Sequence, residues 1–190
     1  MAIGGPDNFR AELYTEYKGN RKKAKDNRPD WFLDLKSWVE SLDGVVMSDN
    51  CEADDLVRIW ALECDKAEIN RVVVTVDKDL DCIPGNHYNP RTKSLYQVSE
   101  EYAERFYWKQ ILTGDSVDNI PGLPKVGPVK AEKILGNEKT PNGLQKLVCR
   151  AYHDIYGDQG YKYLITNGRL IHIWRYLNDH FKIKEEVYAK

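Results

Sequence analysis

One stretch of 23 residues, TGDSVDNIPGLPKVGPVKAEKIL at positions 113–135, limits the possible folds of this chain more than any other. It begins with two carboxylates, Asp115 and Asp118, three residues apart, so a single helical turn would direct both toward one point. The glycines and prolines that follow predict a tight hairpin. Pro128 then favours the start of a helix that ends near residue 135. The stretch thus predicts an acid pair joined directly to a turn and a helix N-terminus.

The expected helix start has the features of a phosphate-binding site. Backbone N–H groups are unpaired at a helix N-terminus and attract anions, and Lys125 and Lys130 lie beside this one in the sequence. Gly122 and Gly127 would let a partner's backbone come close. Each part has a simpler interpretation, in which the acids only cap a helix and the glycines only turn a loop. Taken together, acids suited to a metal beside a phosphate site favour phosphodiester chemistry.

A second pair of acids follows an apolar run. Residues 69–76 are almost entirely aliphatic, as expected for a buried parallel strand, and Asp77 and Asp79 come directly after them. Open α/β sheets bind their ligands at the carboxyl ends of strands. We therefore expect these two carboxylates to lie at a ligand-binding edge.

A third group of acids lies in the first turn of a helix expected over residues 49–68. Asp49 and Glu52 fit a capping box, which explains one or two of these acids by helix capping alone. Glu52, Asp54 and Asp55, however, are three acids within four residues. On a turn that faces other acids they would repel one another unless cations lie among them. A metal site is the better explanation.

The opposite charge gathers between residues 18 and 30. Tyr14 and Tyr17 precede this segment, and basic residues mixed with aromatic ones suit single-stranded nucleic acid. A solvated charged loop explains the composition equally well. The net charge of −2 therefore conceals an uneven distribution, with basic residues gathered at 18–30 and acidic residues gathered in the segments described above. The basic residues of the segment are Lys18, Arg21, Lys22, Lys23, Lys25 and Arg28.

The remaining segments predict a single mixed domain. With 190 residues and 42% hydrophobic content, the chain is long enough to bury one core. An apolar stripe at helical spacing follows Asp30, and we expect Trp31 and Trp38 to pack into the core from that helix. Further elements are expected as a strand at 44–47, a hairpin at 86–98, a helix at 100–112, and a last helix at 161–177 that turns Trp174 inward.

These segments together resemble the structure-specific 5′-nucleases, which include phage 5′→3′ exonucleases, flap endonucleases and the 5′-nuclease domain of bacterial DNA polymerase I. The resemblance covers most of the chain in order and spacing. It rests on Tyr17-Lys18-Gly19-Asn20-Arg21, Glu52-Ala53-Asp54-Asp55, Asp77-Lys78-Asp79 and Gly114-Asp115-Ser116-Val117-Asp118-Asn119.

The resemblance implies an α/β fold, with a PIN-like parallel sheet flanked by helices and a helix–three-turn–helix DNA-binding region. Residues 1–98 would form the nuclease part, with a basic arch at 14–30. Residues 99–190 would form the helix–three-turn–helix and the C-terminal helices of the same compact unit. The family places one acid on a strand upstream and a second acid near Gly4 and Gly5. We therefore expect the N-terminal strand to be missing or shortened.

The resemblance also implies the role of each site residue. Lys18 and Arg21 would reach the scissile phosphate as catalytic residues. Two divalent ions would be held, the first by Glu52, Asp54 and Asp55, and the second by Asp77, Asp79, Asp115 and Asp118. Ligand sets made only of oxygen select Mg²⁺ or Mn²⁺ over zinc, and two ions about 4 Å apart can clamp an in-line phosphoryl displacement. A K⁺ ion is implied at the hairpin. The expected DNA-binding residues are Tyr17, Lys22, Lys23, Lys25, Gly122, Lys125, Gly127 and Lys130.

The expected function is a divalent-metal-dependent 5′→3′ exonuclease or 5′-flap endonuclease of phage DNA replication or degradation. It would act as a monomer on DNA with a 5′ end, flap or junction, or on RNA–DNA duplexes. Four scattered cysteines and the lack of a signal peptide or an 18-residue apolar run predict a cytoplasmic protein without a membrane partner. Two alternatives stay open. One is an inactive structure-specific DNA-binding protein, and the other is a PIN-like ribonuclease, which would not need residues 120–133.

Overall fold

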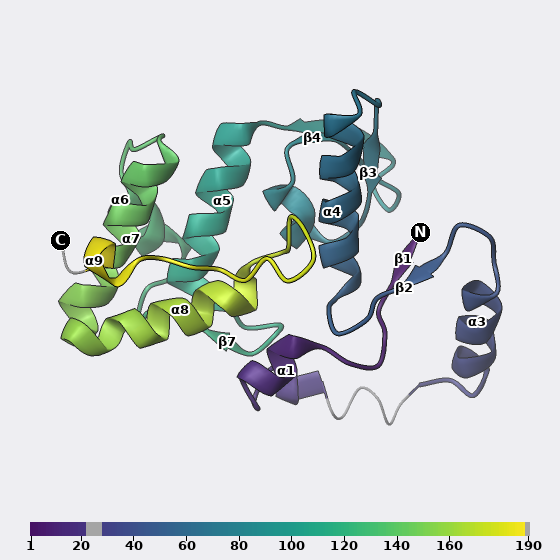
Figure 1. The fold of residues 1–190 in the computed structure, drawn as a ribbon, viewed down its shortest axis with the longest axis horizontal. Helices are drawn as coiled ribbons and strands as arrows, with labels where there is room; N and C mark the ends of the chain where they lie inside the picture. The colour runs from purple at the N-terminus through teal and green to yellow at the C-terminus, as the bar shows by residue number, and fades with distance from the viewer. Residues whose placement is uncertain (22–27, 189–190) are drawn as a thin grey trace.

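The computed structural model describes residues 1–21 and 28–188, which form an α/β fold in which the strands of the N-terminal half lie toward one end and the helices of the C-terminal half lie toward the other (Figure 1). No helix within these ranges is both long enough and apolar enough to cross a lipid bilayer. The strands are β1 (Ala2–Ile3), β2 (Val46–Met47), β3 (Val72–Val74), β4 (Gly85–Asn89), β5 (Ser94–Val98), β6 (Gly114–Asp115) and β7 (Ile120–Pro121). The α-helices are α1 (Phe9–Leu13), α3 (Trp31–Glu40), α4 (Ala53–Lys66), α5 (Glu100–Thr113), α6 (Pro128–Leu135), α7 (Pro141–Tyr156), α8 (Gly160–Ile171) and α9 (Glu185–Tyr188).

Parallel pairing joins segments that are distant in the sequence. β1 lies beside β2, with Ala2 opposite Val46 and Ile3 opposite Met47. β3 is parallel to β4, and β4 pairs with β5 in the antiparallel hairpin expected at residues 86–98. The predicted α/β fold with a parallel sheet is therefore confirmed. Within the described residues the sheet is divided into short pieces, and β1, the N-terminal strand, is only two residues long.

The strand expected at residues 69–76 is shorter and more exposed than predicted. Only Val72–Val74 pairs with β4, and Val73 packs into a core with Ala61 of α4 and with Ile83. Val72 and Val74, by contrast, are 48% and 66% exposed. The apolar run therefore does not form a strand that is buried on both faces, because α4 covers the side of Val73 and the opposite side is open in the described structure.

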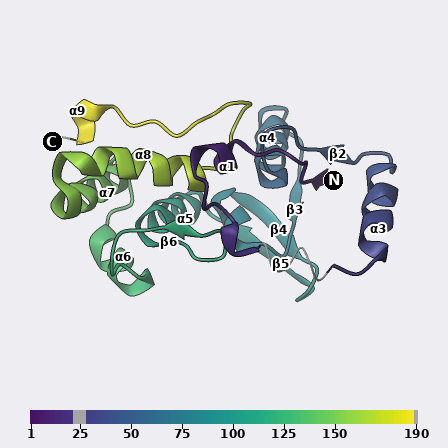
Figure 2. The same cartoon turned by 90° about the horizontal axis from the view of Figure 1, so that it is seen from below.

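Helix α3 corrects a second prediction. It forms where the sequence predicts a helix, but Trp31 and Trp38 are 60% and 59% exposed and none of its residues is buried. The preceding Asp30 makes no side-chain capping hydrogen bond. Figures 1 and 2 show α3 at the edge of the molecule, away from the helical core. Helical spacing of apolar residues predicts an amphipathic helix, but it does not determine whether another element covers the apolar side.

The main hydrophobic core lies among α5, α6, α7 and α8. Leu112, Leu135, Leu144 and Leu164 are completely buried there, one from each helix. The predictions of a helix at 100–112, capped by Ser99, and of a helix at 128–135 are confirmed. The last predicted helix, 161–177, is wrong at its C-terminal end, because α8 stops at Ile171. Trp174 is buried as expected, but from the extended segment that follows α8.

Candidate active site

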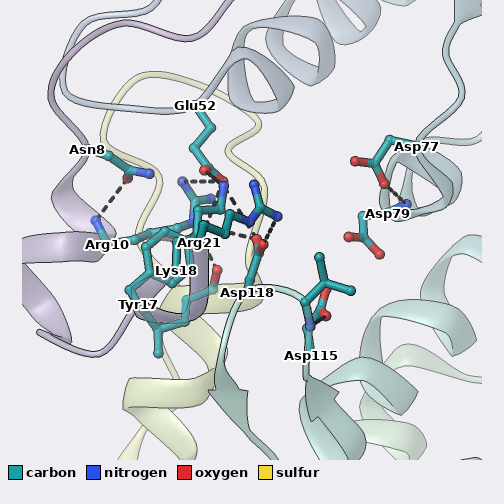
Figure 3. Close-up of polar contacts among 12 residues, drawn as sticks. Asn8, Arg10, Tyr17, Lys18, Arg21, Glu52, Asp77, Asp79, Asp115 and Asp118 are labelled. Atoms are coloured by element: carbon teal, nitrogen blue, oxygen red, sulfur yellow. Dashed lines mark hydrogen bonds and ion pairs between the residues drawn. The ribbon is translucent and has the colours of Figure 1, made fainter. Parts of the chain in front are cut away.

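Acidic side chains from three segments line one small pocket. The pocket encloses about 30 Å³ and lies between the first turn of α4, the segment after β3 and the β6–β7 hairpin. Figure 3 shows Glu52 and Asp118 close together, with Asp77 and Asp79 facing them from across the site and Asp115 between. The carboxylates that line the pocket are Glu52, Asp54, Asp79, Asp115 and Asp118.

The first turn of α4 positions Glu52 and Asp54. Glu52 is the N-cap residue, with extended backbone angles, and its backbone N–H donates to Asp55 Oδ2 at 2.8 Å. The capping pair is therefore Glu52 with Asp55, and the expected pair of Asp49 with Glu52 is wrong because the helix begins three residues later. Asp55 thus closes the helix end, while Glu52 and Asp54 line the pocket.

Asp77 and Asp79 follow β3, as the sequence predicts. Asp77 is the N-cap of a short 3₁₀ helix, Lys78–Cys82, and its Oδ1 accepts a hydrogen bond from the Asp79 backbone N–H at 3.0 Å. The Asp79 carboxylate also accepts a hydrogen bond from Gln110 Nε2 of α5 at 2.7 Å. Gln110, which sequence patterns did not single out, therefore fixes one acid of the pocket.

Asp115 and Asp118 are positioned by a hairpin, which corrects the prediction that a helical turn presents them. Asp115 ends β6 and Asp118 lies in the turn before β7. Asp115 Oδ1 accepts from the Val117 backbone N–H at 2.7 Å, which tightens the turn. Gly114 has a φ of +66°, and a Cβ there would lie 2.3 Å from the Gly122 backbone nitrogen. Glycine at this position lets the two strands meet, and so places both acids at the pocket.

The segment before residue 22 packs against that turn. The Lys18 backbone N–H donates to Asp118 O at 2.9 Å, and Asn20 Nδ2 donates to Ser116 O at 3.0 Å. The Lys18 ammonium forms an ion pair with Glu52 and lies 3.5 Å from Asp118 Oδ2. Arg21 forms an ion pair with Asp118. The two predicted catalytic cations therefore lie among the acids, as Figure 3 shows.

Tyr17 has a different position from the one expected of a DNA-contacting residue. Its side chain is buried, and its hydroxyl oxygen lies between two carboxylates, 3.0 Å from Glu52 Oε2 and 3.2 Å from Asp118 Oδ2, which share the one hydrogen that it can donate. Burial, together with the negative charge of Glu52, raises the pKa of the Tyr17 phenol well above its usual range. The geometry makes Tyr17 a bridge between two acids instead of a surface that stacks on a base. The predicted contacts Lys22, Lys23 and Lys25 lie outside the described residues.

Crowding of the acids affects their protonation. Burial raises the pKa of Asp54 to about 7, with further contributions from Glu52 and Asp77. Burial also raises the pKa of Asp79 to about 7, and the charges of Asp77 and Asp115 add to the effect. The pKa of Asp118 is raised by burial too, although Lys18 and Arg21 oppose this shift. The site therefore concentrates negative charge that its two cations offset only in part.

The donor set fits hard divalent cations. All candidate ligands in the pocket are carboxylates, and oxygen donors are those that Mg²⁺ and Mn²⁺ prefer. Among the described residues, however, no three acidic, histidine or cysteine side chains are grouped closely enough to hold one ion. The acids divide into one group tied to Lys18 and Arg21 and another around Asp79. Binding of an ion would therefore require these side chains to rotate toward it.

Asp55 differs from the other acids in its bonding. It is fully buried, and its carboxylate pairs with both terminal nitrogens of Arg10, at 2.7 and 2.9 Å. This geometry does not fit the prediction that Asp55 is a metal ligand. Arg10 was not expected at the site at all, because a single arginine in a short helix carries no periodic or motif signal.

The candidate phosphate-binding surface lies at the start of α6. Lys125 has a φ of +60° and is exposed in the loop, and Lys130 is exposed in the first turn of the helix. Gly127 is the N-cap residue, and a Cβ there would meet nothing within 4 Å. Gly122 is different, because its Cβ would lie 2.2 Å from the Thr113 carbonyl carbon. Gly122 therefore closes the hairpin, whereas Gly127 leaves the helix N-terminus accessible.

Comparison with known sequences identifies the family. Residues 2–109, more than half of the chain, match the family described as 5′-3′ exonuclease, N-terminal resolvase-like domain. DNA polymerase I of Rhizobium leguminosarum is 29% identical over 137 residues, which are 67% of this chain and 14% of that protein. Flap endonuclease Xni of Shewanella oneidensis is 25% identical over 146 residues, which are 72% of this chain and 56% of that protein. The chain thus spans less than two thirds of the length of either relative.

Solved structures show the same fold. The D15 protein of bacteriophage T5, co-crystallised with metal ions, superposes with a TM-score of 0.60 at 19% identity, covering 90% of this chain and 80% of that one. The T5 D15 flap endonuclease in a pseudo-enzyme–product complex with DNA and metal ions gives a TM-score of 0.58 at 16% identity, covering 99% and 79%. The resemblance drawn from the four motifs is confirmed by these matches. The chain belongs to the 5′-3′ exonuclease family, through its N-terminal resolvase-like domain.

Proposed function

We propose that this protein is a divalent-metal-dependent 5′-nuclease that hydrolyses DNA phosphodiesters. The observation that carries the proposal is the pocket itself, in which five carboxylates from three segments meet beside Lys18 and Arg21. Relatives named flap endonuclease and structures of similar fold crystallised with metal ions and DNA support the same chemistry.

Six acids would hold two Mg²⁺ or Mn²⁺ ions in this proposal. Such ions, when bound, activate water and stabilise charge on the leaving oxygen. The chain's own side chains do the rest. Tyr17 holds Glu52 and Asp118 in place. Lys18 and Arg21 pair with these two carboxylates in the structure. When substrate binds, both cations pair with its phosphate instead and stabilise the charge that develops on it. The proposed ligands are Glu52, Asp54, Asp77, Asp79, Asp115 and Asp118.

The proposed substrate is DNA with a 5′ end, flap or junction. The accessible N-terminus of α6, with Lys125 and Lys130, is suited to grip a duplex through its phosphates, and phosphate contacts carry no sequence information. Specificity would then be for structure, and binding would weaken steeply with salt. Further proposals rest on the family resemblance. They are action on RNA–DNA duplexes, a K⁺ ion at the hairpin, a monomeric state, a cytoplasmic location and a role in phage replication.

A cleavage assay tests the proposal. A 5′-flap substrate labelled at its 5′ end is incubated with the protein and Mg²⁺, beside the variant Asp77→Asn and a control with EDTA. We expect a product from the unchanged protein and at least a hundredfold slower cleavage by the variant, since one charge of the metal site is lost. A product of equal yield in EDTA, or from the variant, would contradict metal-dependent nuclease activity.

One observation favours a second function, that of a structure-specific DNA-binding protein without catalysis. Gly4 and Gly5 line a hollow of about 220 Å³ together with Glu52 and Asp54, at the place where the family resemblance predicts a further acid. The same assay separates the two functions. Flap binding that needs no metal, with no product at any Mg²⁺ concentration, would support the binding protein.

A further inference from the structure

Arg10 is the most completely buried cation in the described structure, at 1% exposure. It lies in the second position of α1, and all three nitrogens of its guanidinium donate hydrogen bonds, four in total. Both terminal nitrogens donate to Asp55, at 2.7 and 2.9 Å. Nε donates to Leu170 O at 2.9 Å, and Nη2 also donates to His172 O at 2.6 Å. One side chain thus joins the N-terminal helix, the first turn of α4 and the end of α8.

Asp55 has no acceptor position left for a metal. Besides the two bonds from Arg10, its Oδ2 accepts from the Glu52 backbone N–H at 2.8 Å and its Oδ1 accepts from the Trp174 backbone N–H at 2.8 Å. A carboxylate has about four lone-pair directions, and here four hydrogen bonds use them. An ion bound to Asp55 would have to displace at least one donor, and a displaced buried N–H is costly.

We infer that Asp55 is not a metal ligand, and that Arg10 is a positioning residue that holds the first turn of α4 in place through it. The consequence for the site is direct, because Glu52 and Asp54 belong to that turn and line the acidic pocket. Arg10 Nη1 lies only 3.8 Å from Glu52 Oε2, so it also faces the nearest acid of the pocket. We call the Arg10–Asp55 pair, with its bonds to residues 170, 172 and 174, the clasp.

The clasp ties the C-terminal segment to the site. Phe9, next to Arg10, stacks on Trp174 with ring centroids 4.8 Å apart. Arg58 of α4 donates to Ile173 O at 2.9 Å, a second link between the same two segments. Residues 170–174 are therefore part of the scaffold of the acidic pocket, although they contribute no acid to it.

The clasp depends on the shape of arginine as well as on its charge. A guanidinium donates from a planar fork in fixed directions, whereas a lysine ammonium supplies a single centre of charge on a flexible stem. Lysine at position 10 could pair with Asp55 but could not also reach both carbonyls. Removing one partner of a buried ion pair leaves the other charge unpaired, which is more damaging than the loss of a surface pair.

The first experiment measures thermal unfolding in EDTA, and it does not depend on the proposed function. We expect Asp55→Asn and Arg10→Lys each to lower Tm by about 10 °C, and the double variant to lose less than the sum. Glu52→Gln, which neutralises an acid of the pocket, should lower Tm by much less than Asp55→Asn, because its amide oxygen can still accept from Tyr17 and Lys18 keeps Asp118 as a partner. Failure of Asp55→Asn to fold, while Glu52→Gln folds, supports the clasp. A Tm for Asp55→Asn equal to or above that of the unchanged protein would overturn it.

A matched control uses another Arg–Asp fork. Arg71 donates to both oxygens of Asp65, at 2.9 and 2.6 Å, but the side chain of Asp65 is 47% exposed and the pair lies away from the pocket. Asp65→Asn should lower Tm by much less than Asp55→Asn. An equal loss would mean that the effect at position 55 is not specific to the clasp.

The second experiment measures Mn²⁺ binding by calorimetry at 10 °C, on samples that circular dichroism shows to be folded, and it rests on the proposed function. Arg10→Lys and Asp55→Asn should keep the number of bound ions and weaken their affinity several-fold, because Glu52 and Asp54 are less well held. Unchanged affinity in both variants would overturn the positioning role, and loss of one ion in Asp55→Asn would make Asp55 a ligand. If the unchanged protein binds no Mn²⁺, the proposed metal dependence fails. The thermal unfolding measured in EDTA would still test whether the clasp holds the first turn of α4.

Discussion

Gly4 and Gly5 are neighbours in the sequence, but a side chain would meet very different surroundings at the two positions. A Cβ at Gly4 would meet nothing within 4 Å, whereas at Gly5 it would lie 1.9 Å from Ser48 O. Gly5 is required by the close approach of two backbones, while Gly4 is not required by packing. Gly4 also lines a hollow together with Glu52 and Asp54.

We therefore predict that Gly4→Asp adds a carboxylate to the metal site. Mn²⁺ should bind about tenfold more tightly to this variant, which corresponds to about 1.4 kcal/mol. In the absence of metal the variant should be less stable, because one more negative charge joins a crowded site. Calorimetric titration with Mn²⁺ checks the prediction. Affinity equal to that of the unchanged protein would show that position 4 does not face the ions, and Gly5→Asp serves as the contrasting variant that should not fold.

At the scale of an element, the β6–β7 hairpin determines where Asp115 and Asp118 point. Its two strands approach so closely at Gly114 and Gly122 that neither position has room for a Cβ. The family resemblance suggested that Gly122 and Gly127 both serve DNA, but only Gly127 lies in open space. The structure thus separates a glycine that shapes the hairpin from one that leaves a helix N-terminus accessible.

This separation gives a paired prediction. Gly122→Ala should lower the free energy of unfolding by about 2–4 kcal/mol, as overpacked or strained sites do. Gly127→Ala should change it by less than about 1 kcal/mol, because the added methyl group contacts nothing and only the preference of the N-cap for glycine over alanine is lost. Urea denaturation of both variants checks this. Equal losses, or a larger loss for Gly127→Ala, would show that the hairpin does not depend on close contact at Gly122.

Elements with local signals were predictable from the sequence, and their surroundings were not. Pro128 and Ser99 marked the starts of α6 and α5 correctly, because capping and proline effects act within one turn. Helical spacing, which is also a local signal, predicts Trp38 in the core, but whether another element covers this side chain is a property of the whole fold.

The same limit applies to the site. The motifs identified Glu52, Asp79 and Asp118 as acids that could meet, and the structure brings them to one pocket. The partners of those acids were missed. Arg10 reaches Asp55 across 45 positions and His172 across 162, and no spacing rule covers such distances.

At the scale of the whole molecule, the segment after α8 carries a buried acid–base network. His172 is buried and its Nε2 lies 2.9 Å from Asp179 Oδ2. Arg175 also donates to Asp179, while Arg58 and Tyr107 face the imidazole from α4 and α5. Burial lowers the pKa of His172 from 6.5 to about 4, and it outweighs the opposing effect of Asp179. The imidazole is therefore neutral in the folded protein at neutral pH.

The free energy of unfolding should consequently decrease as the pH is lowered through a defined window. Because the unfolded chain protonates His172 near pH 6.5 and the folded protein only near pH 4, unfolding takes up a proton between these values. We expect a loss of about 3 kcal/mol from this residue across that window. Burial raises the pKa of Asp179, but hydrogen bonds from Arg175 and His172 outweigh it and lower the pKa below 3.8, so the contribution of Asp179 is lost only in more acidic solution.

Chemical denaturation at a series of pH values checks the histidine prediction. His172→Gln should flatten the slope between pH 6.5 and pH 4, whereas His153→Gln, at an exposed position of α7, should leave it unchanged. A slope that persists in His172→Gln would assign the pH dependence to other groups.

The central claim is that acids from three distant segments share divalent ions in one pocket. Anomalous diffraction from crystals soaked in Mn²⁺ tests it most directly, because it locates each ion without reference to activity. We predict two peaks among Glu52, Asp54, Asp77, Asp79, Asp115 and Asp118, with Asp55 still paired to Arg10. Peaks elsewhere, or no peak in this pocket at saturating Mn²⁺, would contradict the claim.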